Sequence, residues 1–460
     1  MSRLLAELTA KPASIAALEC ARMLVCDSLI CAYAGASLER ARMMRSAALD
    51  AAGDVEVLGT SLRAPTGVAA MLNAETMNAI DADDTFLNGG HFGALQVAVA
   101  LAEARRSRAT WGAMLDAVLR GFELNAAVYL AVGPQPRAYA AGSTIVGATF
   151  TTAALHTHDP HVIANAVGLA LRLAPQPLPL AVATDVRSSM KYAPYGAIAA
   201  SALLATTLAS NGYRADADFL SARPGFLHMQ GAEQPTIEPL RFDGPRWWIE
   251  QTSLKPYPSF RLGHSVLDAL KQALAGRRIE PDTIDRIEVA LDPRAHTLPF
   301  IRKTERVVDD HRAPMFGALN LKYTLALVAL GVPPGPRWYE PAVIADERLW
   351  RLVERIHFDE EPVCSMAELQ VHRDSVTGQI LASIACVRVR LSDGMQLEGR
   401  VEVCDGDPWS EHTRVTWAWL KRKARNFLGD ESLIEFVRGQ DDREPMGTLP
   451  HPRTPGRRAP

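Results

Sequence analysis

Apolar residues recur every three or four positions along most of the chain between Ser14 and about Gly212, which is the spacing of α-helices that bury one face or more. The pattern predicts helices over residues 16–35, 67–81, 110–133, 162–173 and 195–212. Glycine or proline separates most of these segments, and their alanine-rich faces indicate closely packed helices. We therefore predict a large all-helical domain in the first half of the chain.

A second pattern begins near Lys255 and continues to Glu402. β-Branched and polar residues alternate over residues 283–293, 368–375 and 379–403, as they do in strands with one buried face. Asp-Gly at residues 393–394 predicts a tight hairpin turn, because this pair readily adopts positive φ angles. Helical spacing returns after Trp409.

These patterns predict a mostly α protein with an inserted α+β domain. The expected parts are a helical domain over residues 1–254, a smaller α+β lid domain over 255–402, C-terminal helices over 403–440 that return to the helical domain, and a tail over 441–460. The end of the tail is rich in proline and arginine, so we expect the tail to be disordered.

Composition and charge exclude several classes of protein. The 460 residues are 48% hydrophobic and 22% charged, which is ordinary for a globular protein. A formal net charge of -3 argues against nucleic acid or an anionic membrane as a partner. No run of about 18 apolar residues predicts a membrane span, and the N-terminus lacks the apolar core of a signal peptide. We therefore expect a cytoplasmic protein.

Metal ligands are not predicted. The six cysteines form no Cys-x-x-Cys pair and match no zinc or iron–sulfur spacing, so we interpret them as buried apolar side chains. The run from His156 to His161 contains three histidines, and its simplest interpretation is a polar helix end before Pro160. We expect neither a metal nor another cofactor.

One polar stretch, residues 78–104, interrupts the apolar pattern. It gathers three carboxylates, a threonine and a histidine directly before an apolar helix: Asp81, Asp83, Asp84, Thr85 and His91. If residues 78–87 are helical, Asp81, Asp84 and Thr85 share one face, because residues three and four apart are neighbours on a helix, and Asp83 points away. Gly89-Gly90 would then end that helix and place the imidazole over the acidic face. The same arrangement is also typical of a capped corner between two helices.

This stretch resembles a segment shared by the MmgE/PrpD family, which includes 2-methylcitrate dehydratase, cis-aconitate decarboxylase and iminodisuccinate epimerase. Four further segments resemble the family in the same order along the chain: CDSLICAYAG, SSMKYAPYGAIAASALLA, LKPYPSFRLGHSVLDAL and ALNLKYTLALVALGV. The resemblance covers residues 5–430. It implies a large helical domain with an α+β lid, a homodimer, and a cofactor-free site between the two domains.

The resemblance also implies the site residues: His91, Asp81, Thr85, Lys191, Lys255, Tyr323 and His264. The family's reactions develop negative charge on a carbon next to a carboxylate, so the site needs cations and donors where that charge grows. Lys191 and Lys255 are suited to bind the carboxylates, and His91 is suited to carry the proton because imidazole titrates near neutral pH. Asp81 would orient the imidazole, and Thr85 would donate to a carboxylate. Tyr323 or His264 would serve as the acid on the opposite face or as a substrate hydrogen-bond donor.

Several of these residues also have a purely structural interpretation. Lys191 is compatible with an exposed helix start, and Lys255 with a rigid proline turn. Tyr323 lies in an apolar helix, where its ring would be core, and His264 directly precedes a helix that it would cap.

Two positions depart from the family's pattern. Ala141 and Phe260 stand where relatives carry histidines, which weakens the decarboxylase interpretation most. We therefore expect a metal-independent carbon–oxygen lyase that dehydrates a di- or tricarboxylic hydroxy acid, such as 2-methylcitrate or another alkylcitrate, through an enediolate. Epimerisation of an iminodisuccinate-like dicarboxylate is the alternative. A family member that binds its ligand without catalysis is a third interpretation, since a fold does not guarantee its activity.

Overall fold

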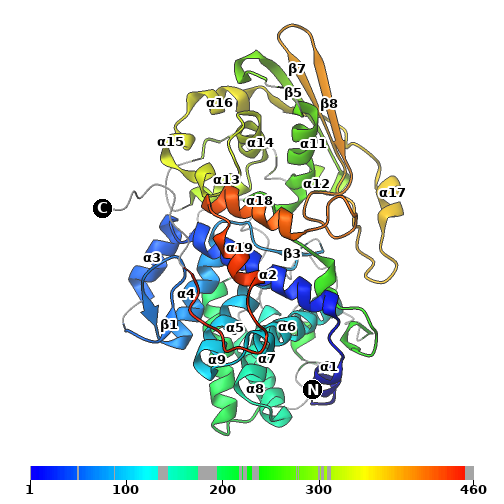
Figure 1. The fold of residues 1–460 in the computed structure, drawn as a ribbon. Coiled ribbons are helices and arrows are strands. Elements are labelled where there is room, and N and C mark those ends of the chain that lie inside the picture. The colour runs from blue at the N-terminus through cyan, green and yellow to red at the C-terminus, as the bar shows by residue number, and fades with distance from the viewer. Residues whose placement is uncertain are drawn as a thin grey trace.

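A computed structural model describes residues 2–48, 51–87, 89–132, 143–174, 194–216, 220, 225–229, 238–275, 277, 279–298, 301, 305–307 and 312–450. The protein is mostly α-helical, with a helical domain and a smaller α+β domain, as the sequence predicts. The helical domain forms the lower part of Figure 1, and the sheet of the α+β domain extends from its upper part.

Ten helices of the described chain precede residue 230, and the long ones follow the apolar pattern. They are α1 (Ser2–Ala10), α2 (Ile15–Gly35), α3 (Glu39–Ala48), α4 (Thr66–Ala79), α5 (Gly93–Ser107), α6 (Trp111–Val132), α7 (Thr144–His156), α8 (Pro160–Leu173), α9 (Tyr195–Ser210) and α10 (Phe226–Met229). The short strands β1 (Val55–Glu56) and β2 (Arg63–Ala64) pair with each other. Helices α4 to α9 pack on one another around an alanine-rich core, as predicted. None of the helices in the described ranges combines the length and apolarity needed to cross a bilayer.

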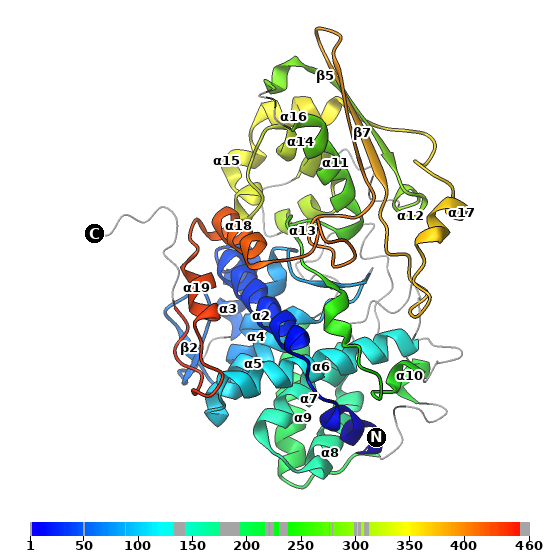
Figure 2. The same cartoon turned by 45° about the vertical axis from the view of Figure 1, so that its right-hand side comes forward.

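The α+β domain is built on one four-stranded sheet in the order β6-β5-β7-β8. Its strands are β5 (Ile284–Leu291), β6 (Ile356–Phe358), β7 (Ala385–Leu391) and β8 (Gln396–Val401). Only the β5–β6 pair is parallel. The turn between β7 and β8 contains Gly394 at a φ of 87°, which confirms the predicted Asp-Gly hairpin. Figure 2 shows this hairpin projecting from the domain.

Helices accompany this sheet. They are α11 (His264–Leu274), α12 (Pro293–His296), α13 (Ala313–Ala318), α14 (Leu321–Ala329), α15 (Pro341–Ile344), α16 (Glu347–Glu354) and α17 (Met366–Leu369). Helix α11 packs on β7 and β8 and also contacts α14, so it lies between the sheet and the remaining helices.

The predicted strand over residues 368–375 is wrong. Helix α17 and a 3-10 turn at Gln370–His372 occupy most of that range. The cause is a local capping box: the Ser365 hydroxyl accepts a hydrogen bond from the Glu368 N–H, and the Glu368 carboxylate accepts one from the Ser365 N–H. These two bonds satisfy N–H groups at a helix start and outweigh the strand-like alternation that follows.

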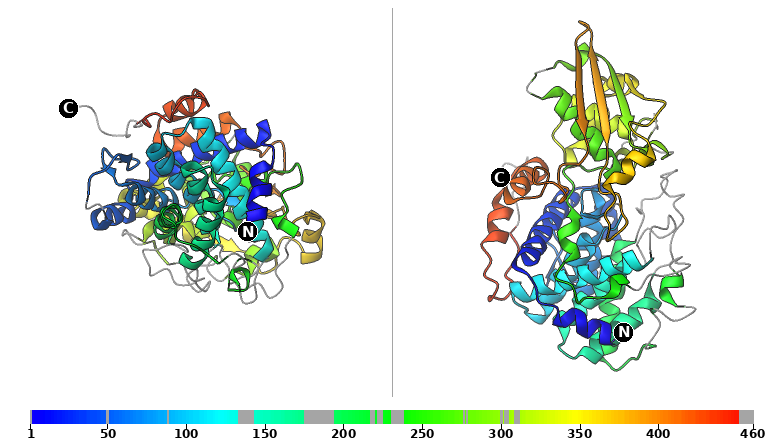
Figure 3. Two further views of the ribbon diagram at one scale, coloured as in Figure 1. Left: turned by 90° about the horizontal axis from the view of Figure 1, so that it is seen from below. Right: turned by 90° about the vertical axis from the view of Figure 1, so that its right-hand side faces the viewer.

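The chain returns to the helical domain at its C-terminal end. Helices α18 (Trp417–Leu428) and α19 (Ser432–Arg438) both pack on α2. Figure 3 shows them beside the blue α2, at the junction of the two parts. Residues 441–450 also lie against this domain, where Met446 and Leu449 are buried and the carbonyl oxygen of Pro450 accepts a hydrogen bond from Tyr33. The packed chain thus extends beyond residue 440; residues 451–460 of the expected tail lie outside the described part.

Paired glycines allow a close contact between two helices of the core. Gly147 on α7 faces Gly121 on α6, and a Cβ atom added at residue 147 would lie 2.1 Å from the carbonyl oxygen of Gly121. Asn125 on α6 accepts a hydrogen bond from the N–H of Gly147 at 2.7 Å, which holds the two backbones together. The close approach therefore depends on the absence of side chains.

We predict that Gly147→Ala lowers the free energy of unfolding by about 1–3 kcal/mol, because the backbones must separate to admit the methyl group. The matched control is Gly67→Ala on α4, where an added Cβ meets no atom within 4 Å. That substitution should be neutral or stabilise by up to about 1 kcal/mol. Urea denaturation measures both variants, and equal effects would contradict the close-packing interpretation.

Candidate active site

The acidic loop, which we define as residues 81–87, lies between α4 and α5. A helix through residues 78–87 would put Asp81, Asp84 and Thr85 on one face, but α4 ends at Ala79 and this expectation is wrong. Asp81 adopts a φ of 59° and Leu87 a φ of 51°. Such left-handed angles end a right-handed helix, and aspartate tolerates them because its short side chain bonds locally.

A short strand pair connects the acidic loop to the segment that carries Lys255. Strand β3 (Thr85–Phe86) pairs antiparallel with β4 (Thr252–Ser253). The ring of Phe86 anchors this pair, since it packs edge-on against three aromatic rings, those of Phe122, Tyr129 and Trp248. Lys255 follows β4 by two residues and is thereby brought to the loop.

Lys255 and Asp81 form a buried ion pair. The Nζ atom of Lys255 lies 2.8 Å from Oδ1 of Asp81 and donates a second bond to the Asp81 carbonyl oxygen at 3.2 Å. Lys255 is only 1% exposed, so its ammonium group is bonded inside the protein rather than to bulk water. An ammonium group has three N–H donors, and these bonds use two of them.

His91 lies between the acidic loop and α5, at the start of the helix as predicted. Its Nδ1 atom is 2.7 Å from the carbonyl oxygen of Asp84. Because a carbonyl oxygen only accepts, Nδ1 carries the hydrogen, and Nε2 of the neutral imidazole is then the acceptor. The carboxylate near Nδ1 is that of Asp83, at 3.8 Å, whereas the sequence interpretation gave this place to Asp81.

Asp84 closes the N-terminus of α5. Its two carboxyl oxygens accept hydrogen bonds from the N–H groups of Gly93 at 2.7 Å and Phe92 at 3.2 Å. Burial raises the pKa of Asp84 to about 8, and the neighbouring charge of Asp83 adds to this, although the two N–H groups oppose it. The Asp84 carboxyl therefore holds a proton through most of the neutral range.

The structure places His264 next to this cluster in a neutral form. Its Nε2 atom donates to the carbonyl oxygen of Ser259 at 3.1 Å. Burial, with the nearby charges of Arg261 and Lys255, holds the pKa of His264 well below its ordinary range. The Nδ1 atom is buried with no hydrogen-bond partner among the residues described. His264 is thus arranged to accept a hydrogen bond rather than to act as a cationic acid.

Tyr323 is fully buried on α14, and its hydroxyl donates to the carbonyl oxygen of Trp338. Burial raises its pKa above the ordinary value, so the proton is held firmly. The neighbouring Tyr339 donates to the carbonyl oxygen of Pro258 and feels the charge of Asp81. The tyrosine whose pKa is affected by the charge of Asp81 is therefore Tyr339, which was not predicted from the sequence.

Thr85 faces the interior from β3. It is fully buried, and its Oγ1 atom has no hydrogen-bond partner in the described part of the chain. Lys191 and Ala141 lie outside the described residues, so their predicted positions stay predictions. Tyr195, which starts α9 four residues after Lys191, donates its hydroxyl to the carbonyl oxygen of His91 at 3.2 Å.

Two further buried ion pairs adjoin the site and were missed by sequence reasoning. Lys423 on α18 pairs with Asp27 on α2, with Nζ 2.5 Å from Oδ1. Arg261 pairs with Asp407, whose Oδ1 also accepts a bond from Ser253 next to β3. Asp27 is the one charged residue between residues 23 and 35 of α2, which is a usable signal, but the charged run around Lys423 gives no sign of which residue turns inward.

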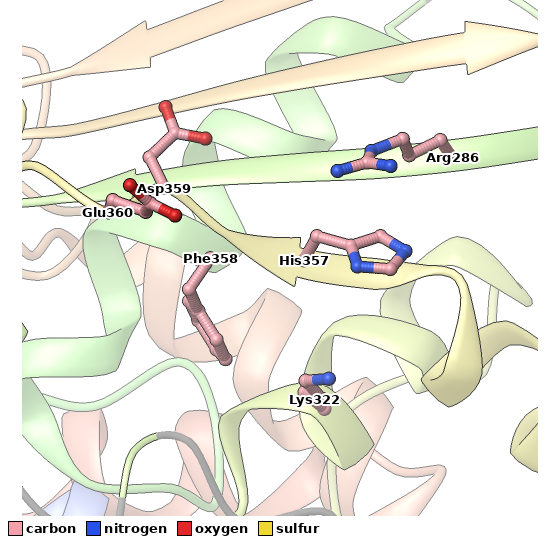
Figure 4. A pocket seen from close by; sticks show the side chains of 6 residues that line it. All are labelled: Arg286, Lys322, His357, Phe358, Asp359 and Glu360. Atoms are coloured by element: carbon pink, nitrogen blue, oxygen red, sulfur yellow. The ribbon is translucent and has the colours of Figure 1, made fainter.

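Two pockets in the described part of the chain lie near this cluster or on the α+β domain. One of about 290 Å³ is lined by Tyr257, Trp419 and Lys423, among others, so it lies behind the segment that holds Lys255. Figure 4 shows a larger one of about 460 Å³ at the edge of the sheet, lined by Arg286 of β5, His357 of β6 and Lys322 of α14, among others. None of the residues lining the second pocket belongs to the predicted site.

No group of three or more His, Cys, Asp or Glu side chains in the described ranges is placed to hold a metal ion. All six cysteines are free thiols, and three of them, Cys26, Cys31 and Cys404, are buried. Burial raises the pKa of each buried thiol above its ordinary value, so these side chains behave as small apolar groups.

Comparison with protein families covers nearly the whole chain. Residues 1–237 match the MmgE/PrpD N-terminal domain, and residues 257–431 match the MmgE/PrpD C-terminal domain. The chain belongs to the MmgE/PrpD family. This confirms the resemblance recognised in the sequence, and MmgE/PrpD membership supports a function of the dehydratase or lyase type or a related one. No curated protein matches the chain in sequence.

The raised pKa of Asp84 predicts a pH dependence of stability. Folding raises this pKa from 3.8 to about 8, so the folded state binds the proton more tightly than the unfolded state. The resulting stability is fully present below about pH 4 and is lost as the pH rises through about 8. We expect the free energy of unfolding of the wild type to fall over this range relative to that of Asp84→Asn, which cannot ionise. Urea denaturation at about pH 5, 7 and 9 measures the difference, and parallel profiles would refute it.

Proposed function

We propose that this MmgE/PrpD protein is a carbon–oxygen lyase that dehydrates a hydroxy di- or tricarboxylic acid with its own side chains as the catalytic groups. An alkylcitrate such as 2-methylcitrate is the proposed substrate. The observation that carries the proposal is the hydrogen bond between His91 Nδ1 and the carbonyl oxygen of Asp84, because it fixes the imidazole and assigns its hydrogen to Nδ1; we propose Nε2 as the base.

The imidazole is held for this role from two sides. Its Nδ1–H is fixed by the Asp84 carbonyl oxygen, and its own backbone carbonyl accepts the hydroxyl of Tyr195. His91 keeps 8% of its surface exposed, more than the Asp81, Lys255 or Thr85 beside it. A base that is fixed in direction is what proton abstraction requires.

The substrate carboxylate would meet cations and donors. Lys255 contributes an ammonium group with a remaining donor, and Thr85 contributes a buried hydroxyl whose oxygen has no hydrogen-bond partner in the part described. A buried polar group without a partner is costly, so a substrate oxygen at this place would regain that energy. Lys191 is proposed as the second ammonium group.

The proposed reaction balances without another reactant. His91 Nε2 takes the proton from the carbon next to a carboxylate, and the electron pair of that C–H bond moves onto the carboxylate as an enediolate. That electron pair then forms a double bond to the adjacent carbon atom, while the bond between that carbon and its hydroxyl oxygen breaks. The departing hydroxyl takes the proton back from His91 and leaves as water.

Dehydration fits the geometry better than epimerisation. An epimerase needs a proton carrier on each face of the carbon, whereas elimination on one face needs only His91. In the described part of the chain, the two residues expected on the opposite face are engaged elsewhere: His264 is neutral and bonded to Ser259, and Tyr323 is bonded to Trp338.

The reaction type is testable with a panel of di- and tricarboxylic acids in deuterium oxide. We expect 2-methylcitrate or a related alkylcitrate to lose water, with a new alkene signal in the proton NMR spectrum and an absorbance of the conjugated alkene in the ultraviolet. Exchange of the α-proton without loss of water would establish epimerisation instead. Release of carbon dioxide would establish decarboxylation and contradict the proposal.

Two substitutions distinguish the roles of the two nitrogen atoms of His91. In His91→Asn the amide nitrogen can replace Nδ1 and keep the bond to Asp84, but no base stands at the position of Nε2. We expect turnover to fall about 10²–10⁴-fold while the melting temperature stays unchanged. His91→Gln should lose both activity and the Asp84 bond, and therefore some stability. Full turnover by His91→Asn would remove His91 from the proposed role.

A further inference from the structure

Two buried ammonium groups hold consecutive carbonyl oxygens of the acidic loop. Lys255 donates to the carbonyl oxygen of Asp81 at 3.2 Å, and Lys423 donates to that of Ala82 at 2.8 Å. Each ammonium group also pairs with a carboxylate, Lys255 with Asp81 and Lys423 with Asp27. The two lysines reach the loop from separate segments, Lys255 from the chain after β4 and Lys423 from α18.

We propose that Lys423, held in place by Asp27, is a positioning residue that fixes the backbone of the acidic loop and thereby the direction of the His91 imidazole. Its part in turnover rests on the function proposed above, but its effect on the loop does not.

The path from Lys423 to the base is short: it consists of the hydrogen bond to the Ala82 carbonyl oxygen, two further residues of backbone, and the hydrogen bond between the imidazole and the Asp84 carbonyl oxygen. Ala82 lies between Asp81, which pairs with Lys255, and Asp83, and the next residue is Asp84, whose carbonyl oxygen holds His91 Nδ1. The positive φ of Asp81 gives the loop a backbone conformation that needs support from its surroundings. A displacement of Ala82 therefore changes the position of the oxygen atom that sets the imidazole direction.

The ion pair between Lys423 and Asp27 is held in a fixed position by its surroundings. The side chains of Lys423 and Asp27 are each 1% exposed, and Nζ of Lys423 also lies 3.6 Å from the thiol of Cys31. Burial opposes the charge on both groups, yet Asp27 raises the pKa of Lys423 above its ordinary value. Burial raises the pKa of Asp27 to about 6, against the lowering effect of Lys423. A charged pair this well buried is a costly way to join α18 to α2, since an apolar pair of similar volume would serve stability as well or better.

Replacing the charged pair with an apolar pair tests the proposal. Lys423→Met removes the ammonium group and leaves Asp27 buried without its cation, so both stability and positioning should suffer. The double variant Lys423→Met/Asp27→Leu replaces the whole pair with apolar side chains, and it should regain stability because no buried charge is left alone. It cannot restore the bond to the Ala82 carbonyl oxygen.

Hydrogen–deuterium exchange of the peptide covering residues 78–93 measures the protection of the backbone N–H groups in and around the acidic loop, and it needs no substrate. Several of its N–H groups are hydrogen-bonded within the loop or to the Asp84 side chain, including those of Gly90, Phe92 and Gly93. We expect faster exchange there in Lys423→Met and in the double variant. Exchange equal to that of the wild type in both would overturn the proposal.

Turnover gives the second measurement. We expect kcat to fall about 10- to 100-fold in both variants with a smaller change in KM, because the base is misplaced while Lys255 keeps its ion pair with Asp81. A double variant that regains kcat together with stability would show that the pair is only structural, and would overturn the proposal. If the wild type turns over none of the acids tested, the proposed function fails, and the exchange data alone decide the positioning role.

The matched control is Lys11→Met. Lys11 is also a buried lysine, but its ammonium group bonds Glu123 and the carbonyl oxygen of Arg246 instead of the acidic loop. We expect this variant to lose stability while exchange over residues 78–93 keeps its wild-type rate. Faster exchange in that peptide would show that any buried charge defect loosens the loop, which would also overturn the proposal.

Discussion

The charge of a carboxylate that is buried away from water must be stabilised by partners inside the protein, and this requirement organises the centre of the molecule. Asp81, Asp83 and Asp84 are 4%, 1% and 1% exposed, and they stand within four consecutive residues. Each of these three carboxyl groups is stabilised in a different way. Asp81 receives an ammonium group from Lys255, Asp84 receives two backbone N–H groups and a raised pKa, and Asp83 accepts the side-chain amide of Asn78 at 2.8 Å. The result is a polar interior in which each group has a defined direction.

The fold serves this interior by bringing distant segments to it. Strands β3 and β4 are only two residues long, yet their pairing brings Lys255 to a carboxylate 174 positions earlier in the sequence. The aromatic rings around Phe86 stabilise that short pair, because two strand residues alone would be marginal. The α+β domain therefore contributes to the centre of the helical domain through the chain that leads into it, and the two domains share one electrostatic core.

The apolar pattern alone predicts most of the fold and only part of the site. Helices such as α6 and the β7–β8 hairpin follow from the spacing of apolar residues and from one Asp-Gly turn, which are local signals. The helix expected over residues 78–87 is wrong, because spacing cannot reveal that Asp81 adopts a left-handed φ. The position of His91 before α5 is evident from the sequence, but the neighbouring carboxylate is Asp83, since the loop path, not helical geometry, decides which side chains meet. Lys423 has no local signal at all, because its partner is 396 residues away.

The distance in sequence between Asp27 and Lys423 bears on how the protein is made. Asp27 lies in α2, whereas Lys423 follows it by 396 residues, so a ribosome must add that length of chain before this pair can form. Until then the nascent helical domain must leave Asp27 hydrated or protonated, because a lone buried charge is too costly. The interior of the helical domain therefore depends on a late segment of the chain, because α18 and α19 pack on α2.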